Sequence, residues 1–127
     1  MLAQRRAHTT LPVADLDAAR TFYEERLGFT VVNVQPSAVM FGAGEGSVFA
    51  ITKSTGRATG GHTQLGFTVT DIEAEVADLK RRGVVFEEYD SPDFRTAGSI
   101  ASIGPNRGAW FKDPEGNLVG LIQFAAG

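Results

Sequence analysis

The chain has 127 residues, of which 43% are hydrophobic and 21% charged, a composition typical of one globular domain with a substantial core. It contains no cysteine, which excludes disulfides, thiolate metal ligands and a cysteine nucleophile. The net charge of −3 and the lack of a basic stripe argue against nucleic acid as a partner. No apolar run approaches the roughly 20 residues of a membrane span, and no apolar segment follows the N-terminus as in a signal peptide. We therefore expect a cytoplasmic protein that binds neither nucleic acid nor membranes.

The first half of the chain predicts a strand, a helix and three further strands. Residues 7–13 alternate apolar Leu11 and Val13 with polar positions, as in a strand with one buried face. Asp15 is a typical N-cap for the helix that follows, and Gly28 is a typical stop. Three strand-like runs separated by turn residues complete one βαβββ module over residues 7–52: Thr30–Gln35, Ala38–Gly42 and Ser47–Thr52.

The second half begins as a repeat of the first. Residues 53–61 are polar and glycine-rich, which is typical of a linker. A strand over His62–Thr70 and a helix from Asp71 to Arg82 follow. Equivalent positions of the two halves lie 56 residues apart, as in the pairs Leu11/Phe67, Val13/Val69 and Asp15/Asp71. The chain therefore carries an internal duplication.

The rest of the second module, residues 62–124, predicts more strands. Val84–Tyr89 is strand-like, Asp90–Arg107 looks irregular, and Ile100–Ile103 within it could be a short strand or an ordered loop. Gly108–Gln123 predicts a hairpin with a five-residue connection. These elements predict an α+β fold of two tandem βαβββ modules. A ferredoxin-like domain fits less well, because four apolar runs lie between the two helices where that fold has two strands.

The alternation also assigns sides to the first strand of each module. Leu11, Val13 and their counterparts in the repeat must pack under the helices. The opposite faces carry polar or small residues: Arg6, His8 and Thr10 in the first module, and His62, Gln64, Gly66 and Thr68 in the second. If both sheets curl, these faces line a concave cleft suited to a small molecule.

Three motifs resemble the vicinal oxygen chelate superfamily of glyoxalase I, bleomycin-resistance proteins and extradiol dioxygenases. They are His8-x-x-Leu11-x-Val13-x-Asp15-Leu16 with Phe22-Tyr23 and Leu27-Gly28-Phe29, its echo Phe67-x-Val69-x-Asp71-Ile72, and Trp110-Phe111-x-Asp113-Pro114-x-Gly116-Asn117. The similarity covers about His8 to Gln123. The resemblance implies paired βαβββ modules that form a cleft, frequently within a homodimer.

The resemblance further implies four metal-ligand positions, which carry over as His8, Ala50, Gln64 and Gly120. Ala50 and Gly120 have no donor atom, and a histidine with a neutral amide brings no negative charge to offset a divalent cation. We therefore expect a degenerate metal site and no cofactor. The alternative is a metal site built from His8 and a ligand placed elsewhere, such as His62 or Glu88.

Ten residues are candidates for ligand binding, with His8 also a candidate for proton transfer. Phe94 lies in a loop over residues 91–98 that has little reason to bury an aromatic ring except over a cleft or a partner. Trp110 begins a hairpin strand and is the first candidate for an aromatic wall of the ligand site. Glu87 and Glu88 are expected to be a solvated pair at a strand end. The candidates are Arg6, His8, Thr10, Phe41, His62, Gln64, Thr68, Phe94, Arg95 and Trp110.

Three functions remain open for this chain. The favoured one is a metal-independent protein that binds a small, partly aromatic or apolar molecule between its modules and sequesters it or turns it over slowly. The second is a metal-dependent lyase, isomerase or dioxygenase of the same superfamily, and the third is a non-catalytic interaction module. We expect a homodimer, because the exposed sheet edges of two modules need covering.

Overall fold

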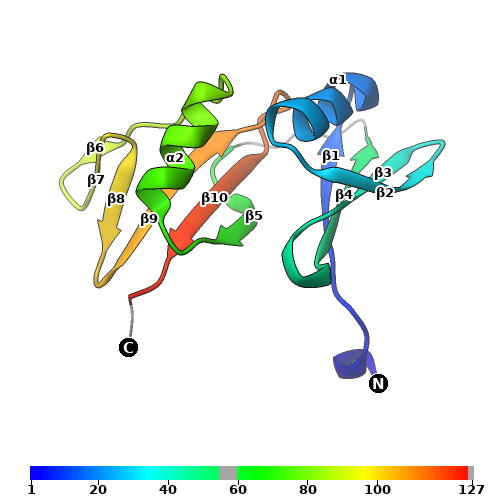
Figure 1. Cartoon of the computed structure of the whole chain (residues 1–127), viewed down its shortest axis with the longest axis horizontal. Coiled ribbons are helices and arrows are strands. Elements are labelled where there is room, and N and C mark those ends of the chain that lie inside the picture. The colour runs from blue at the N-terminus through cyan, green and yellow to red at the C-terminus, as the bar shows by residue number, and fades with distance from the viewer. Residues whose placement is uncertain (55–59, 126–127) are drawn as a thin grey trace. The chain divides into compact units, whose positions relative to one another are not determined.

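The duplication seen in the sequence corresponds to two compact units, Met1–Arg57 and Ala58–Gly127. The computed structural model describes residues 1–54 and 60–125 (Figure 1). Most of the expected linker, 53–61, lies outside the described residues, although Lys53 still belongs to a strand. Each unit combines a helix with a β-sheet, which confirms the α+β class. The cleft expected between the modules stays a prediction.

The first unit is a four-stranded sheet covered by one helical segment. Its strands are β1 (Thr9–Val13), β2 (Thr30–Gln35), β3 (Ala38–Gly42) and β4 (Val48–Lys53), in the order β1-β4-β3-β2. β1 pairs parallel with β4, and the other pairs are antiparallel. The helix α1 (Leu16–Thr21) continues into a π-helical turn, η2 (Phe22–Arg26), and short 3-10 turns lie at Leu2–Gln4 and Gly44–Gly46.

The core of the first unit is aromatic. Asp15 starts α1 by accepting a hydrogen bond from Ala18 N at 3.0 Å, as its N-cap role predicts. The ring of Tyr23 then lies 5.5 Å from Phe41 and 5.4 Å from Phe49, measured between centroids. All three side chains are buried, and the buried Leu11 of β1 completes this layer. Phe41 is therefore a core residue on the helix side of the sheet and not part of the opposite, open face.

The second unit is a six-stranded sheet with one helix on its face (Figure 1). It contains β5 (Thr63–Thr68), α2 (Ile72–Arg81), β6 (Asp90–Ser91), β7 (Phe94–Ala97), β8 (Ile100–Ile103), β9 (Asn106–Lys112) and β10 (Leu118–Gln123). The strand order is β5-β10-β9-β8-β7-β6, with β5 and β10 parallel and the other pairs antiparallel. Among the described residues, no helix has the length and hydropathy needed to cross a membrane.

Two sequence expectations for the second unit are wrong. Val84–Tyr89 is not a strand, because only Phe86 pairs with the sheet, through a single bridge to Phe111. Asp90–Arg107 is not irregular either, since it folds into β6, β7 and β8 and the start of β9. Strands of two to four residues are too short to show a period of two. Ile100–Ile103, left open by the sequence, is a strand.

The hairpin of β9 and β10 is confirmed, and its connection is held by one carboxylate. Asp113 is 4% exposed and accepts hydrogen bonds from Glu115 N at 2.9 Å, Asn117 N at 2.8 Å and Asn117 Nδ2 at 2.8 Å. These bonds satisfy donors that the tight turn would otherwise bury unpaired. The Asp-Pro-Glu-Gly-Asn motif is therefore a structural requirement of the turn.

Candidate functional site

The four positions implied as metal ligands include Ala50 and Gly120, whose strand pairings match in register between the two units. In the first unit Thr10 of β1 pairs with Ala50 of β4, and in the second unit Gly66 of β5 pairs with Gly120 of β10. Thr10 and Gly66 are 56 residues apart, so the repeat extends to the pairing of the strands. Thr10 and Gly66 are exposed, while Ala50 and Gly120 are buried.

In the second unit the indole of Trp110 lies over two glycines. A Cβ added to Gly120 would lie 3.0 Å from Trp110 Nε1, and one added to Gly108 would lie 2.7 Å from Trp110 Cη2. The pyrrole edge therefore rests on β10 and the benzene edge on β9. Trp110 Nε1 also donates a hydrogen bond to Thr63 Oγ1 at 3.1 Å, which ties the ring to β5. The indole occupies the space that a larger side chain at position 120 would need.

Thr63 reaches this face through a bulge that the sequence did not reveal. Thr63 pairs with Leu118 and Leu65 pairs with Val119, so β5 carries one extra residue, Gln64, at this point. Strict alternation would place Thr63 with the buried Leu65 on the helix side. The bulge instead turns Thr63 towards Trp110. Its only sequence signal is the two glycines and three polar residues at positions 60–64.

Trp110 is part of an aromatic cluster with Tyr89 and Phe94. The ring centroids lie 5.3 Å apart for Phe94 and Trp110, 5.2 Å for Tyr89 and Phe94, and 6.0 Å for Tyr89 and Trp110, all in edge-to-face arrangements. Each side chain is only half-buried. Burial, together with the charge of Glu87, raises the pKa of Tyr89 above its usual 10, so its phenol stays neutral at physiological pH.

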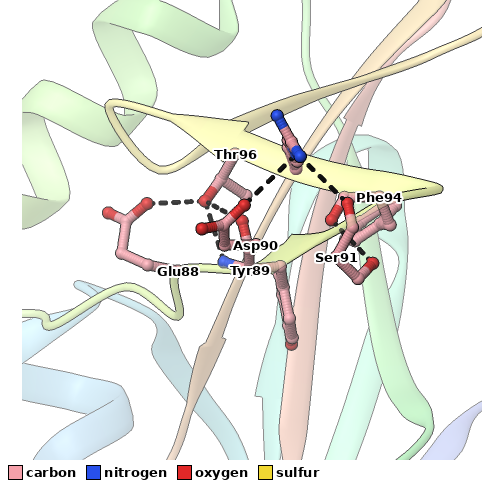
Figure 2. Close-up of polar contacts among 7 residues, drawn as sticks. Glu88, Tyr89, Asp90, Ser91, Phe94 and Thr96 are labelled. Atoms are coloured by element: carbon pink, nitrogen blue, oxygen red, sulfur yellow. Dashed lines mark hydrogen bonds and ion pairs between the residues drawn. The ribbon is translucent and has the colours of Figure 1, made fainter.

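Glu88 forms a hydrogen-bond network with Thr96 and Ser99, and Figure 2 shows its contact with Thr96 next to Tyr89. Glu88 accepts from Thr96 Oγ1 at 2.6 Å, Ser99 Oγ at 2.5 Å and Ser99 N at 3.2 Å. These bonds, those from Ser99 first, hold the pKa of Glu88 below its usual 4.5. The expectation that Glu87 and Glu88 are merely solvated is therefore wrong, since Glu87 also contacts Lys112, with Oε1 and Nζ 3.4 Å apart.

Arg95 points away from the cluster. Its guanidinium pairs with Asp90 at 3.2 Å and donates to the carbonyl of Ser91 at 3.3 Å, within its own hairpin (Figure 2). Alternation along β7 places Arg95 on the face opposite Phe94. Of the expected site residues, the structure thus brings Phe94 and Trp110 into contact and leaves Arg95 outside that group.

The other candidates of the second unit lie in β5 or just before it. Gln64 is half-buried in the bulge of β5, and Thr68 is exposed on the face that carries Trp110. His62 is exposed and precedes β5 by one residue. Gln64 and Thr68 flank Gly66 along β5, and the Cβ position of Gly66 is open except for the carbonyl of Gly120 at 4.0 Å.

In the first unit the candidates lie at the start of β1. His8 is exposed and lies one residue before β1, and Thr10 is exposed within it. Arg6 donates a hydrogen bond to the carbonyl of Gly46, in the turn between β3 and β4, so its guanidinium is already partly engaged. Phe41 is buried in the core, as described above.

The four positions implied as metal ligands do not fit a divalent ion. Ala50 and Gly120 offer no donor, and the space beside Gly120 is filled by the indole of Trp110. Glu88, the acid considered as a replacement, already accepts hydrogen bonds from Thr96 and Ser99. Within residues 1–54 and 60–125, no group of three or more His, Cys, Asp or Glu side chains could hold a metal ion.

Comparisons with known proteins agree on one superfamily. Residues 5–121 match the profile of the Glyoxalase/Bleomycin resistance protein/Dioxygenase superfamily. Virulence protein STM3117 of Salmonella typhimurium is 30% identical over 131 residues, which cover 98% of this chain and 87% of that protein. The crystal structure of TnmS3, an antibiotic binding protein from Streptomyces sp. CB03234, has a TM-score of 0.72 at 25% identity, with 98% of this chain and 99% of that chain covered. A glyoxalase/bleomycin resistance protein/dioxygenase from Nocardioides shares the fold with a TM-score of 0.73 at 20% identity, covering 98% and 87% of the two chains.

Proposed function

Because the chain belongs to the Glyoxalase/Bleomycin resistance protein/Dioxygenase superfamily, we propose that it binds a small organic molecule with a flat aromatic part. The ligand stacks against the aromatic cluster of Tyr89, Phe94 and Trp110 and is sequestered or turned over slowly without a metal. The observation that carries this proposal is the half-buried cluster on the face opposite α2. Aromatic rings that only filled a core would be covered.

The chemistry of the cluster supports a ligand with a π-system and little charge. The Trp110 N–H already donates to Thr63, so the indole offers a ring face and not a free donor. The neutral phenol of Tyr89 adds a group that can both donate and accept a hydrogen bond. A well-placed aromatic pair contributes about 0.5–1.5 kcal/mol beyond the burial of apolar area.

Similarity to TnmS3, an antibiotic binding protein, supports binding as the activity. The superfamily also contains enzymes, so a metal-dependent lyase, isomerase or dioxygenase that uses His8 is the rival. Metal analysis of the purified protein separates the two. Stoichiometric zinc, nickel, manganese or iron that disappears in His8→Ala would refute the metal-free proposal.

Binding can be measured through Trp110, the only tryptophan of the chain. A titration compares the flat probe 2-naphthol with its saturated counterpart decahydro-2-naphthol, and bleomycin is tested in parallel. We expect 2-naphthol to change the Trp110 emission and to bind about two- to tenfold more tightly than the saturated alcohol, as expected for the stacking contribution.

A matched pair of variants locates the site. Phe94→Leu removes a ring of the cluster, whereas Phe124→Leu removes a ring that is 56% exposed and lies just after β10, outside the cluster. Phe94→Leu should weaken 2-naphthol binding by a similar two- to tenfold factor, and Phe124→Leu should leave it unchanged. Equal effects of both variants, or no binding of any aromatic probe to the wild type, would refute the proposed site.

We also propose that the protein is a homodimer. β2 is an edge strand of the first sheet, and its Val32 and Val34 are 53% and 54% exposed. An exposed apolar edge strand can pair with another chain. Analytical ultracentrifugation at micromolar concentration tests this proposal, and sedimentation as monomer alone would remove it.

A further inference from the structure

The segment that carries Tyr89 and Phe94 is weakly held by the sheet itself. β6 and β7 pair at only two positions, Asp90 with Arg95 and Ser91 with Phe94. β7 and β8 also pair at only two positions. β6 is the edge of the sheet, so no further strand from the part of the chain that the structure describes pairs with it. A two-stranded hairpin of this length is marginal in water unless other contacts fix it.

The carboxylate of Glu88 supplies such contacts from outside the hairpin. One oxygen accepts from Thr96 Oγ1 at 2.6 Å and from Ser99 N at 3.2 Å, and the other accepts from Ser99 Oγ at 2.5 Å. Thr96 in turn accepts from Tyr89 N at 2.9 Å through its hydroxyl, and its own N–H donates to the carbonyl of Tyr89 at 2.9 Å. The Glu88 side chain is thereby connected to the end of β7, to the following turn through Ser99 and, through Thr96, to the backbone of Tyr89. Figure 2 shows the contacts that Thr96 makes with Glu88 and Tyr89.

The turn between β7 and β8 shows why such a clamp is needed. Ser99 has a φ of 74°, which is uncommon for a residue with a Cβ, and its side chain is 1% exposed. A residue with a strained backbone conformation persists only where contacts from its surroundings hold it in that conformation. A buried hydroxyl also requires a partner. Glu88 meets both needs, because it accepts from the backbone and from the hydroxyl of Ser99.

We propose that Glu88 is a positioning residue for the aromatic cluster, an inference that rests on the proposed function of this site. Its carboxylate fixes Thr96 and Ser99, which hold the hairpin of β6 and β7 so that Tyr89 and Phe94 meet Trp110. Glu88 itself does not contact the ligand. Without the clamp the hairpin samples other positions, and the binding-competent arrangement becomes a fraction of the population.

The test compares Glu88→Ala and Glu88→Gln with the matched control Glu87→Gln. Glu87 is the preceding residue and has the same charge, but its partner is Lys112. Near-UV circular dichroism and the Trp110 emission measure the packing of the cluster without ligand. Titration with 2-naphthol measures its affinity for an aromatic ligand. All measurements are made where each variant is fully folded by far-UV circular dichroism, so that a loss of global stability alone would not change them.

We expect Glu88→Ala to alter the near-UV spectrum and to weaken 2-naphthol binding by about tenfold, which corresponds to about one molecule in ten being competent. Glu88→Gln keeps the shape and one carbonyl acceptor, so its effect should be smaller, and Glu87→Gln should match the wild type. An unchanged spectrum and affinity for folded Glu88→Ala would overturn the inference.

Failure of the proposed function would look different. If the wild type binds no aromatic probe, the proposed function fails, while the ligand-free spectra of the variants still show whether Glu88 holds the cluster. If Glu88→Ala does not fold, Thr96→Val and Ser99→Ala each remove one hydroxyl partner of the same carboxylate. Either variant should then reproduce the spectral change and weaker binding, and wild-type behaviour in both would refute the inference.

Discussion

The placement of the indole over two glycines can be tested with three Gly→Ala substitutions on one sheet face. None of the three glycines has a positive φ that alanine would resist, so the steric surroundings of the new methyl group should decide the outcome. The added Cβ would meet only a backbone oxygen at 4.0 Å at Gly66. It would meet Trp110 Nε1 at 3.0 Å at Gly120, and Trp110 Cη2 at 2.7 Å at Gly108.

Two opposing contributions set the size of the effect. Alanine in place of glycine within a strand stabilises by about 0.5–1 kcal/mol, because the unfolded chain loses less entropy on folding. A methyl group forced into an occupied space costs about 1–3 kcal/mol. Gly66→Ala should therefore raise the free energy of unfolding by about 0.5–1 kcal/mol. Gly108→Ala should lower it by about 1–2 kcal/mol, and Gly120→Ala should fall between them.

Urea denaturation followed by far-UV circular dichroism measures these differences, and a Trp110→Ala background identifies their cause. Without the indole, Gly108→Ala should lose most of its cost, so that the coupling free energy between positions 108 and 110 is about 1–2 kcal/mol. Equal stability of the three single variants, or a coupling near zero, would refute the placement of the ring.

Three further outcomes follow from the contacts around the hairpins. As pH falls below 4.5, the wild type should lose near-UV signal and free energy of unfolding, because the pKa of Glu88 is lowered in the folded state and the unfolded state therefore binds the proton more readily. The charge of Lys80 also favours the charged form of Glu88. Glu88→Gln should lack this part of the transition. Ser99→Gly should be about 1 kcal/mol more stable than Ser99→Ala in urea denaturation, since both lose the hydroxyl but only glycine accepts a φ of 74° without strain, and equal stabilities would argue against strain there. Asp113→Ala should lower the free energy of unfolding by about 3 kcal/mol because it removes the acceptor of three hydrogen bonds in a buried turn, and a loss below about 1 kcal/mol would show that the turn holds without it.

The fold was largely predictable from the sequence because the repeat supplies the same information twice. Strand alternation predicts the burial of Leu11 and Val13, and both are buried. Helix-capping preferences predict Asp71 as the N-cap of the second helix, which it is. The hairpin of β9 and β10 followed from its turn residues. Local rules suffice for these elements, since each is long enough or has a distinctive turn.

The aromatic cluster was only partly predictable. The sequence predicts exposure of Phe94 from its place in a polar segment and of Trp110 as an aromatic residue at the start of a hairpin strand, but their contact depends on β8 and β7 lying beside β9. That arrangement is encoded by strands of four residues or fewer, whose pairing is set by tertiary contacts and not by a local pattern. The expectation that Glu88 is solvated is wrong because its partner Ser99 lies eleven residues away, and no local sequence pattern reveals that contact.

The packing of Trp110 on Gly120 also limits how this surface could change by mutation. A glutamate at position 120 would collide with the indole, so an acidic side chain there requires a smaller residue at position 110 first. That first step would remove a wall of the aromatic cluster before any new carboxylate was available. Two linked substitutions therefore separate the present aromatic surface from an acidic one on this strand. Gly120 has no side chain, yet the packing of Trp110 on it limits which substitutions position 120 can accept.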